Sequence, residues 1–172
     1  MKTSTRTAKD VAFIGLAAAS LTAVKLALSW IANVELVTLF LVFYTFSLGA
    51  KRTFCACNIF ILVEIFIYGF APWTISYFIH WNALVLVVLL MKKAGVQKPI
   101  FYALLCLGIT FLFGVQTSIV EVLFFSPNTA FFKAVLMRYF MGLTFFAVHM
   151  ASSFFSVLII LPYLLKLPFL KK

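Results

Sequence analysis

Side chains that can carry charge stand inside long apolar stretches of this sequence, among them Lys25, Glu64, His80, Arg138 and His149. A charge in a hydrocarbon environment costs at least about 2.5 kcal/mol, so residues of this kind usually face the interior of a helix bundle or a water-filled cavity. Two kinds of chemistry suit them. They could bind a polar ligand, or the histidines and the glutamate could act as general acid and base.

Internal pairing is a third interpretation of the same charges. Lys25 and Arg138 could neutralise the acidic residues Glu35, Glu64 and Glu121 in buried ion pairs that only fix the order of the helices. The tryptophans near these charges also have a structural interpretation, because tryptophan is enriched at membrane interfaces. The sequence alone leaves ligand binding and internal pairing open.

The histidines, cysteines and carboxylates do not have a spacing that specifies a metal ion. The three cysteines lie in or near apolar stretches, and we expect Cys55, Cys57 and Cys106 to be buried as small hydrophobic residues. The sequence therefore predicts neither a disulfide framework nor a zinc site.

The elements that must position these residues are membrane spans. Hydrophobic residues make up 65% of the 172 residues and charged residues only 10%, which excludes a water-soluble fold. The net charge of +10 comes from short clusters between apolar runs, which argues against nucleic-acid binding. We predict an all-α membrane protein with a single domain over residues 1–172, a compact bundle of six transmembrane helices at approximately 11–31, 36–48, 54–70, 75–91, 100–120 and 134–165. The second run is short, so five spans is the alternative.

Basic clusters predict the orientation, because cytoplasmic loops are enriched in lysine and arginine. Eleven of the fourteen basic residues precede the first span, follow the second or fourth, or end the chain: Lys2, Arg6, Lys9, Lys51, Arg52, Lys92, Lys93, Lys98, Lys166, Lys171 and Lys172. The connections around Asn33, Pro72 and Pro127 carry no such cluster. This alternation places both chain ends in the cytoplasm. The basic, alanine-rich start superficially resembles a signal peptide, but the apolar run continues past any plausible cleavage point.

Depth in the bilayer follows from the direction of each span. The third span runs outward, which places Glu64 beyond the midplane at 1.5 Å rise per residue. The fourth span runs inward, so its aromatic residues and His80 lie in the outer half. We therefore expect an outward-facing binding cavity. Its candidate residues are Asn33, Glu35, Glu64, Tyr68, Trp73, Tyr77, His80, Trp81, Arg138 and His149.

The first span has a ladder of small residues, in which Gly15, Ala19, Ala23 and Ala27 recur every fourth residue. Small residues let two helices approach closely in lipid. The ladder could pack against another helix of this chain or dock a separate membrane subunit. By helical spacing, we expect Thr22, Lys25 and Ser29 on the opposite face.

Several stretches resemble the S components of energy-coupling factor (ECF) vitamin transporters, which are their substrate-binding membrane subunits. The resemblance spans nearly the whole chain. It is carried by the alanine-rich first helix, residues 33–38 (NVELVT), residues 64–70 (EIFIYGF) followed by Trp73 and Tyr77, and residues 142–153 with His149.

This resemblance implies a six-helix fold in the plasma membrane of a prokaryote, with a vitamin pocket facing outward. The partners it implies are a transmembrane coupling subunit and two cytoplasmic ATPases, so this chain would need no cofactor and would not be an enzyme. Ala19 and Ala23, with Gly15, match the family pattern that contacts the coupling subunit. Cobalamin is the ligand of the nearest family pattern, and pyridoxine or another small vitamin comes next.

Two other classes of function remain open from the sequence. A small membrane enzyme or lipid carrier would use His149, His80 and Glu64 as acid and base. A structural membrane subunit would use its charges only to order helices. Turnover by the isolated chain would distinguish the enzyme, and tolerance of paired charge removal would distinguish the structural subunit.

Overall fold

The structure is a computed structural model that describes residues 2–125 and 130–167, with side chains from residue 7 onward. This part of the chain forms six α-helices and no strand, which confirms the all-α prediction. The helices are α1 (Lys2–Ala27), α2 (Val37–Ser47), α3 (Ala50–Tyr68), α4 (Pro72–Lys93), α5 (Pro99–Phe125) and α6 (Phe131–Leu164).

Four helices are long and apolar enough to cross a membrane, and they lie over Thr7–Ala27, Pro72–Lys93, Pro99–Phe125 and Phe131–Leu164. The chain therefore has the character of a membrane protein. Among the other two helices, α2 has only 11 residues, which corresponds to about 16 Å. The remaining helix, α3, has 19 residues and carries three charged side chains.

The first helix ends at Ala27, although its apolar run continues through Trp30 and Ile31. The chain turns over residues 28–36, where Asn33 has a positive φ of 59°. Asparagine tolerates this left-handed conformation better than other side chains do. Hydrophobicity could not predict this boundary, because the turn itself carries apolar residues, and Trp30 and Ile31 are exposed there.

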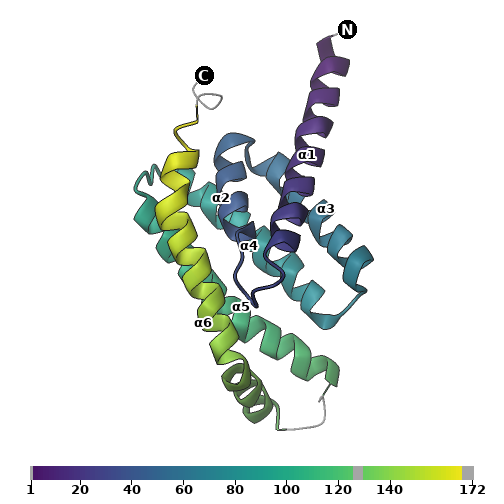
Figure 1. The fold of residues 1–172 in the computed structure, drawn as a ribbon, viewed down its shortest axis with the longest axis vertical. Coiled ribbons are helices and arrows are strands. Elements are labelled where there is room, and N and C mark those ends of the chain that lie inside the picture. Colours follow the sequence, from purple (N-terminus) through teal and green to yellow (C-terminus); the bar gives the residue numbers. More distant parts are fainter. Residues whose placement is uncertain (1, 126–129, 168–172) are drawn as a thin grey trace.

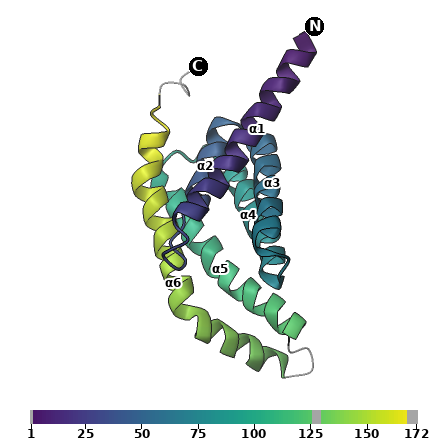
Figure 2. The same ribbon diagram turned by 45° about the vertical axis from the view of Figure 1, so that its right-hand side comes forward.

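The start of α1 and the end of α6 lie at the same end of the molecule (Figures 1 and 2). The connections α2–α3 and α4–α5 lie at this end too, since Arg52 bonds Asp10 at 2.6 Å and Lys92 Nζ donates to the carbonyl oxygen of Phe46 at 3.2 Å. Here we call this the basic end. The described side chains that define it are Lys9, Lys51, Arg52, Lys92, Lys93, Lys98 and Lys166. The side chains of Lys2, Arg6, Lys171 and Lys172, and the connection around Pro127, lie outside the described residues.

The core is formed mainly by α2, α3, α4 and α5, with Leu21 of α1 and Val157 of α6 reaching into it. Its largest buried side chains include Tyr102 and Phe60. The last helix, α6, packs chiefly along α5, and this pair extends well beyond the other helices in both views (Figures 1 and 2). At the end remote from the basic end, this helix pair therefore projects beyond the rest of the bundle.

The cysteines differ in exposure. Cys57 and Cys106 are buried, as expected, whereas Cys55 is exposed on the outer surface of α3. The prediction for Cys55 was wrong because neighbouring residues of a helix point about 100° apart. An apolar run therefore does not tell which of its residues faces the bundle.

Candidate functional site

A cavity of about 310 Å³ lies between the connection 28–36 and the ends of α1, α3 and α4 that are remote from the basic end. Helices α5 and α6 close its far side with Phe113 and His149. We call it the aromatic cavity. Its lining side chains are Lys25, Leu28, Ser29, Ile31, Ala32, Asn33, Val34, Glu35, Val37, Tyr68, Tyr77, Trp81, Phe113 and His149.

Aromatic rings form one wall of this cavity. The ring of Tyr77 lies 4.2 Å from that of Trp81 and 5.9 Å from that of Phe113, measured between centroids. Trp73 supports Tyr77 from behind at 4.9 Å. Such tilted contacts are favourable for aromatic pairs, so the wall is held in place before any ligand arrives. A flat ring could stack on it.

The ammonium group of Lys25 lies beside this wall. Lys25 Nζ is ion-paired with Glu64 Oε2 and donates a hydrogen bond to Tyr77 Oη at 3.1 Å. It also lies over the rings of Tyr77, Trp81 and Trp73, at 4.3, 5.7 and 5.6 Å from their centroids. Because the Glu64 side chain is 0% exposed, its charge depends on this lysine for compensation.

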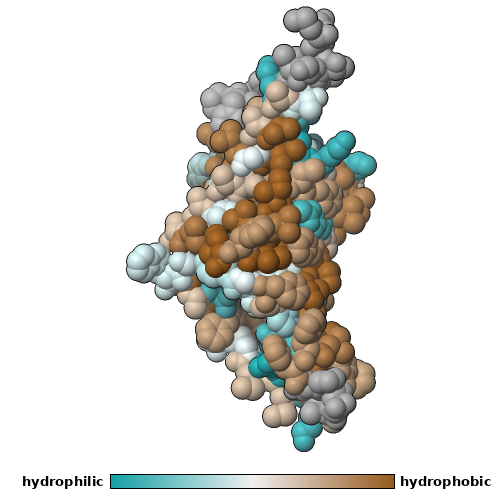
Figure 3. Space-filling view, turned by 90° about the vertical axis from the view of Figure 1, so that its right-hand side faces the viewer, coloured by the Kyte–Doolittle hydropathy of each residue, from teal (hydrophilic) through white to brown (hydrophobic). Residues whose placement is uncertain are grey.

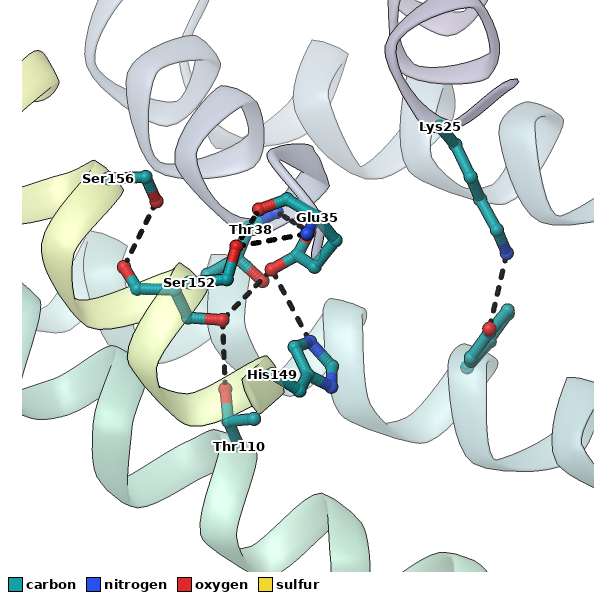
Figure 4. Close-up of polar contacts among 9 residues, drawn as sticks. Lys25, Glu35, Thr38, Thr110, His149, Ser152 and Ser156 are labelled. Carbon is teal, nitrogen blue, oxygen red and sulfur yellow. Dashed lines mark hydrogen bonds and ion pairs between the residues drawn. The ribbon is translucent and has the colours of Figure 1, made fainter. Parts of the chain in front are cut away.

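The carboxylate of Glu35 connects the turn after α1 to both α2 and α6 (Figure 4). Its Oε2 accepts from the backbone N–H of Thr38 at 2.9 Å, and its Oε1 accepts from Ser153 Oγ at 2.9 Å. His149 Nε2 lies 3.3 Å from the same Oε1. Thr38 is the second residue of α2, so Glu35 satisfies one of the free N–H groups at this helix start.

The backbone of Glu35 is held as firmly as its side chain. Its N–H donates to Ser152 Oγ at 2.9 Å, and the same hydroxyl donates to its carbonyl oxygen at 2.7 Å. Burial alone would raise the pKa of the Glu35 carboxyl, but hydrogen bonding and the charge of His149, with help from Thr38, outweigh it and lower the pKa below its usual range. Glu35 is therefore an anchored carboxylate at the cavity edge.

The structure brings together six of the ten predicted site residues as cavity lining: Asn33, Glu35, Tyr68, Tyr77, Trp81 and His149. Three others, Glu64, Trp73 and His80, lie behind the wall and contact lining residues. His80 is 3% exposed and packs on Phe113 with 4.7 Å between ring centroids.

Arg138 is not brought to this cavity. Its Nε bonds Glu121 Oε2 at 2.9 Å in a second cavity further along α5 and α6. The reason is the extension of this helix pair: Arg138 is 11 residues before His149 on the same helix, which is about 16 Å along its axis. A shared helical face therefore did not mean a shared cavity.

Sequence reasoning missed Lys25 and Phe113 as lining residues. A lysine inside a span was a signal for Lys25, which was expected near the outer polar region but was not included among the candidate cavity residues. Phe113 is one of 22 phenylalanines, and no local signal separates it from the others. The serines that hold Glu35 needed tertiary contacts to be recognised.

The ladder on α1 stays uncovered within the described chain. Gly15, Ala19 and Ala23 are exposed and line a shallow apolar groove with Ile59 and Val63 of α3. The face of the molecule that carries α1 and α3 is mostly hydrophobic (Figure 3).

The expectation that Thr22, Lys25 and Ser29 lie on the face of α1 opposite to the ladder was partly wrong. Thr22 lines the same groove as the ladder, and Ser29 lies beyond the end of the helix. Lys25 and Ser29 both line the aromatic cavity, on the side opposite to the ladder, so only Thr22 was misplaced. Thr22 was misplaced because it follows Ala19 by three residues, which makes the two neighbours on a helix surface.

No group of three or more histidine, cysteine or acidic side chains suitable for a metal ion occurs within residues 2–125 and 130–167. Ser153 Oγ donates to Glu35 and accepts from Thr110, so its contacts differ from those of a serine activated by a histidine base.

Comparison with protein-family models, curated proteins and solved structures finds no match to this chain. The functional interpretation therefore depends on the cavity, the charges around it and the distribution of basic residues.

Proposed function

We propose that this chain is the substrate-binding S component of an ECF-type importer, which captures a vitamin from outside the cell for ATP-driven uptake. The observation that carries the proposal is the aromatic cavity, which lies remote from the basic end and combines a preformed ring wall with anchored polar groups. Its partners would be a transmembrane coupling subunit and two cytoplasmic ATPases, in the plasma membrane of a prokaryote.

The proposed topology has six spans with both chain ends in the cytoplasm. Basic side chains gathered at one end of the bundle support it, because this is the pattern of cytoplasmic loops. Helix α3 has 19 residues, about 28 Å, which nearly matches a hydrocarbon thickness of about 30 Å. In this orientation the aromatic cavity opens toward the outside.

The cavity favours a small ring vitamin. Its volume of about 310 Å³ is at the lower end of the range of ligand pockets, roughly 300–1,000 Å³. We therefore place a single-ring vitamin such as pyridoxine before cobalamin, whose corrin ring would extend outside this cavity. The positive charge of Lys25 is already compensated by Glu64, so the site suits a ligand that is neutral or weakly basic.

A thermal-shift screen of the purified chain tests the proposal. A vitamin at 1,000 times its dissociation constant stabilises the folded state by about 4 kcal/mol, and a stabilising vitamin is the expected result. Phe113→Ala should weaken the effect because Phe113 lines the cavity and is 8% exposed. Phe101→Ala, on the same helix at a position that is 49% exposed, is the matched control. The absence of a shift with any vitamin would contradict the proposal.

The uncovered ladder is the proposed contact for the coupling subunit. A tryptophan in place of Ala19 or Ala23 should prevent close helix approach, so the subunits should no longer copurify while the chain still binds vitamin. Phe13→Trp, at an exposed position outside the groove, is the control. Copurification of both tryptophan variants at the normal level would rule out this contact.

A further inference from the structure

A second cavity, of about 380 Å³, lies along the outer part of α5 and α6. We call it the Arg138 cavity. Its lining includes Asn33, Thr117, Ser118, Glu121, Arg138 and Phe146. None of the lining of the aromatic cavity except Asn33 recurs in it.

The two cavities follow each other along the same pair of helices. On α5, Phe113 lines the aromatic cavity and Thr117, one turn further, lines the Arg138 cavity. On α6, His149 and Phe145 are related in the same way. Residues four apart are neighbours on one helix face. The cavities are therefore consecutive parts of one strip, with Asn33 at their boundary.

Polar groups in the Arg138 cavity are only partly satisfied by the protein. Arg138 bonds Glu121 through its Nε, and its two terminal amino groups are further hydrogen-bond donors. The Thr117 hydroxyl is buried, with the side chain 9% exposed, and has no hydrogen-bond partner among the described residues. A buried polar group without a partner is unfavourable, so this hydroxyl points to a ligand group.

The paired charges of Arg138 and Glu121 determine which ligand groups this cavity can favour. An anion next to Arg138 would also lie next to the carboxylate of Glu121, because the two side chains are in contact. The fields of the pair therefore largely cancel. Amide and hydroxyl groups of a ligand can accept from Arg138 and donate to Glu121 without this repulsion.

We infer that the two cavities form one bipartite ligand site, which rests on the proposed function of vitamin capture. The ring of the ligand occupies the aromatic cavity. An uncharged arm with amide or hydroxyl groups passes Asn33 and bonds Thr117 and Arg138. The substrate class is a vitamin with a ring and a polar, uncharged arm.

Isothermal titration of the purified full chain tests this inference with two matched pairs of probes. Riboflavin is compared with lumichrome, which is its ring system without the ribityl arm, and pyridoxine is compared with 3-hydroxy-2-methylpyridine, which lacks only the hydroxymethyl arms. For at least one pair we expect the vitamin to bind the natural sequence more tightly than the bare ring does.

Thr117→Val removes the hydroxyl but keeps the shape of the side chain. It should weaken binding of the vitamin about three- to tenfold, the effect of one lost hydrogen bond, and leave the bare ring unaffected. Arg138→Gln should act in the same direction, and the 43% exposed Arg138 side chain makes it tolerant of substitution. Thr144→Val, at an exposed position of α6, should change neither affinity.

Equal affinity of vitamin and bare ring in both pairs would overturn the bipartite site while leaving vitamin capture intact. The same conclusion would follow if Thr117→Val and Arg138→Gln changed neither affinity. If no probe binds, the bipartite site is rejected. Failure of the whole vitamin panel in the thermal-shift screen is the separate result that would reject the proposed function.

Discussion

Removing the positive charge of Lys25 should destabilise the protein more than removing the charge of Arg52 or Arg138, whose acidic partners are partly exposed. Lys25→Met leaves the Glu64 carboxylate, which is 0% exposed, without its ion-pair partner. Breaking a buried pair in this way costs about 3–5 kcal/mol, because one charge remains buried and uncompensated. Most of this loss is the penalty for the orphaned carboxylate.

The double variant Lys25→Met with Glu64→Gln distinguishes this cause from lost packing. It removes both charges, so it should recover most of the loss, with a coupling energy of about 2–3 kcal/mol. The matched control is Asp10→Asn, which breaks the ion pair of Asp10 with Arg52. That pair is 42% and 37% exposed, and exposed pairs contribute only about 0–1 kcal/mol.

Unfolding of the purified variants in mixed micelles by titration with dodecyl sulfate measures these free energies. Fluorescence is a suitable signal because Trp73 and Trp81 lie within 6 Å of Lys25 Nζ. If Lys25→Met cost no more than Asp10→Asn, or if the double variant lost the sum of its single variants, the reasoning about Glu64 would be refuted.

Two further predictions concern the outer helix pair and the anchored carboxylate. Gly142→Ala would put a Cβ 2.7 Å from the ring of Phe146. It should therefore lower the free energy of unfolding by about 1–3 kcal/mol. Gly108→Ala, with open space around it, is the control and should not destabilise the protein. The lowered pKa of Glu35 means that its carboxylate contributes to the free energy of unfolding above pH 4.5, its ordinary pKa. This contribution is lost as the pH falls toward the pKa of about 2 in the folded protein. Acid should therefore destabilise the natural sequence more than Glu35→Gln between about pH 4.5 and 3; equal acid sensitivity would contradict this role.

Much of the helical architecture could be predicted from the sequence because lipid-facing helices must be apolar over most of their length. Helix α2 was expected over 36–48 and lies over Val37–Ser47. Helix starts were less accurate, and α3 begins at Ala50, four residues before the expected 54, because polar residues at the basic end continue the helix beyond the apolar run.

The pairing of charges was partly predictable. The ion-pair interpretation expected Lys25 and Arg138 to neutralise acidic residues, and the structure pairs them with Glu64 and Glu121. It did not anticipate that Glu35 would be held by His149 and two hydroxyl groups. Those contacts join residues more than 100 positions apart, and only the packing of the turn after α1 against α6 creates them.

The most direct test of vitamin capture is mass spectrometry of the small molecules that copurify with the chain. We predict a vitamin retained by the natural sequence at about one molecule per chain and lost from Phe113→Ala, while Phe101→Ala keeps it. A chain that retains no vitamin and binds none when it is added would contradict the proposed function. Equal retention by Phe113→Ala would show that the ligand lies outside the aromatic cavity.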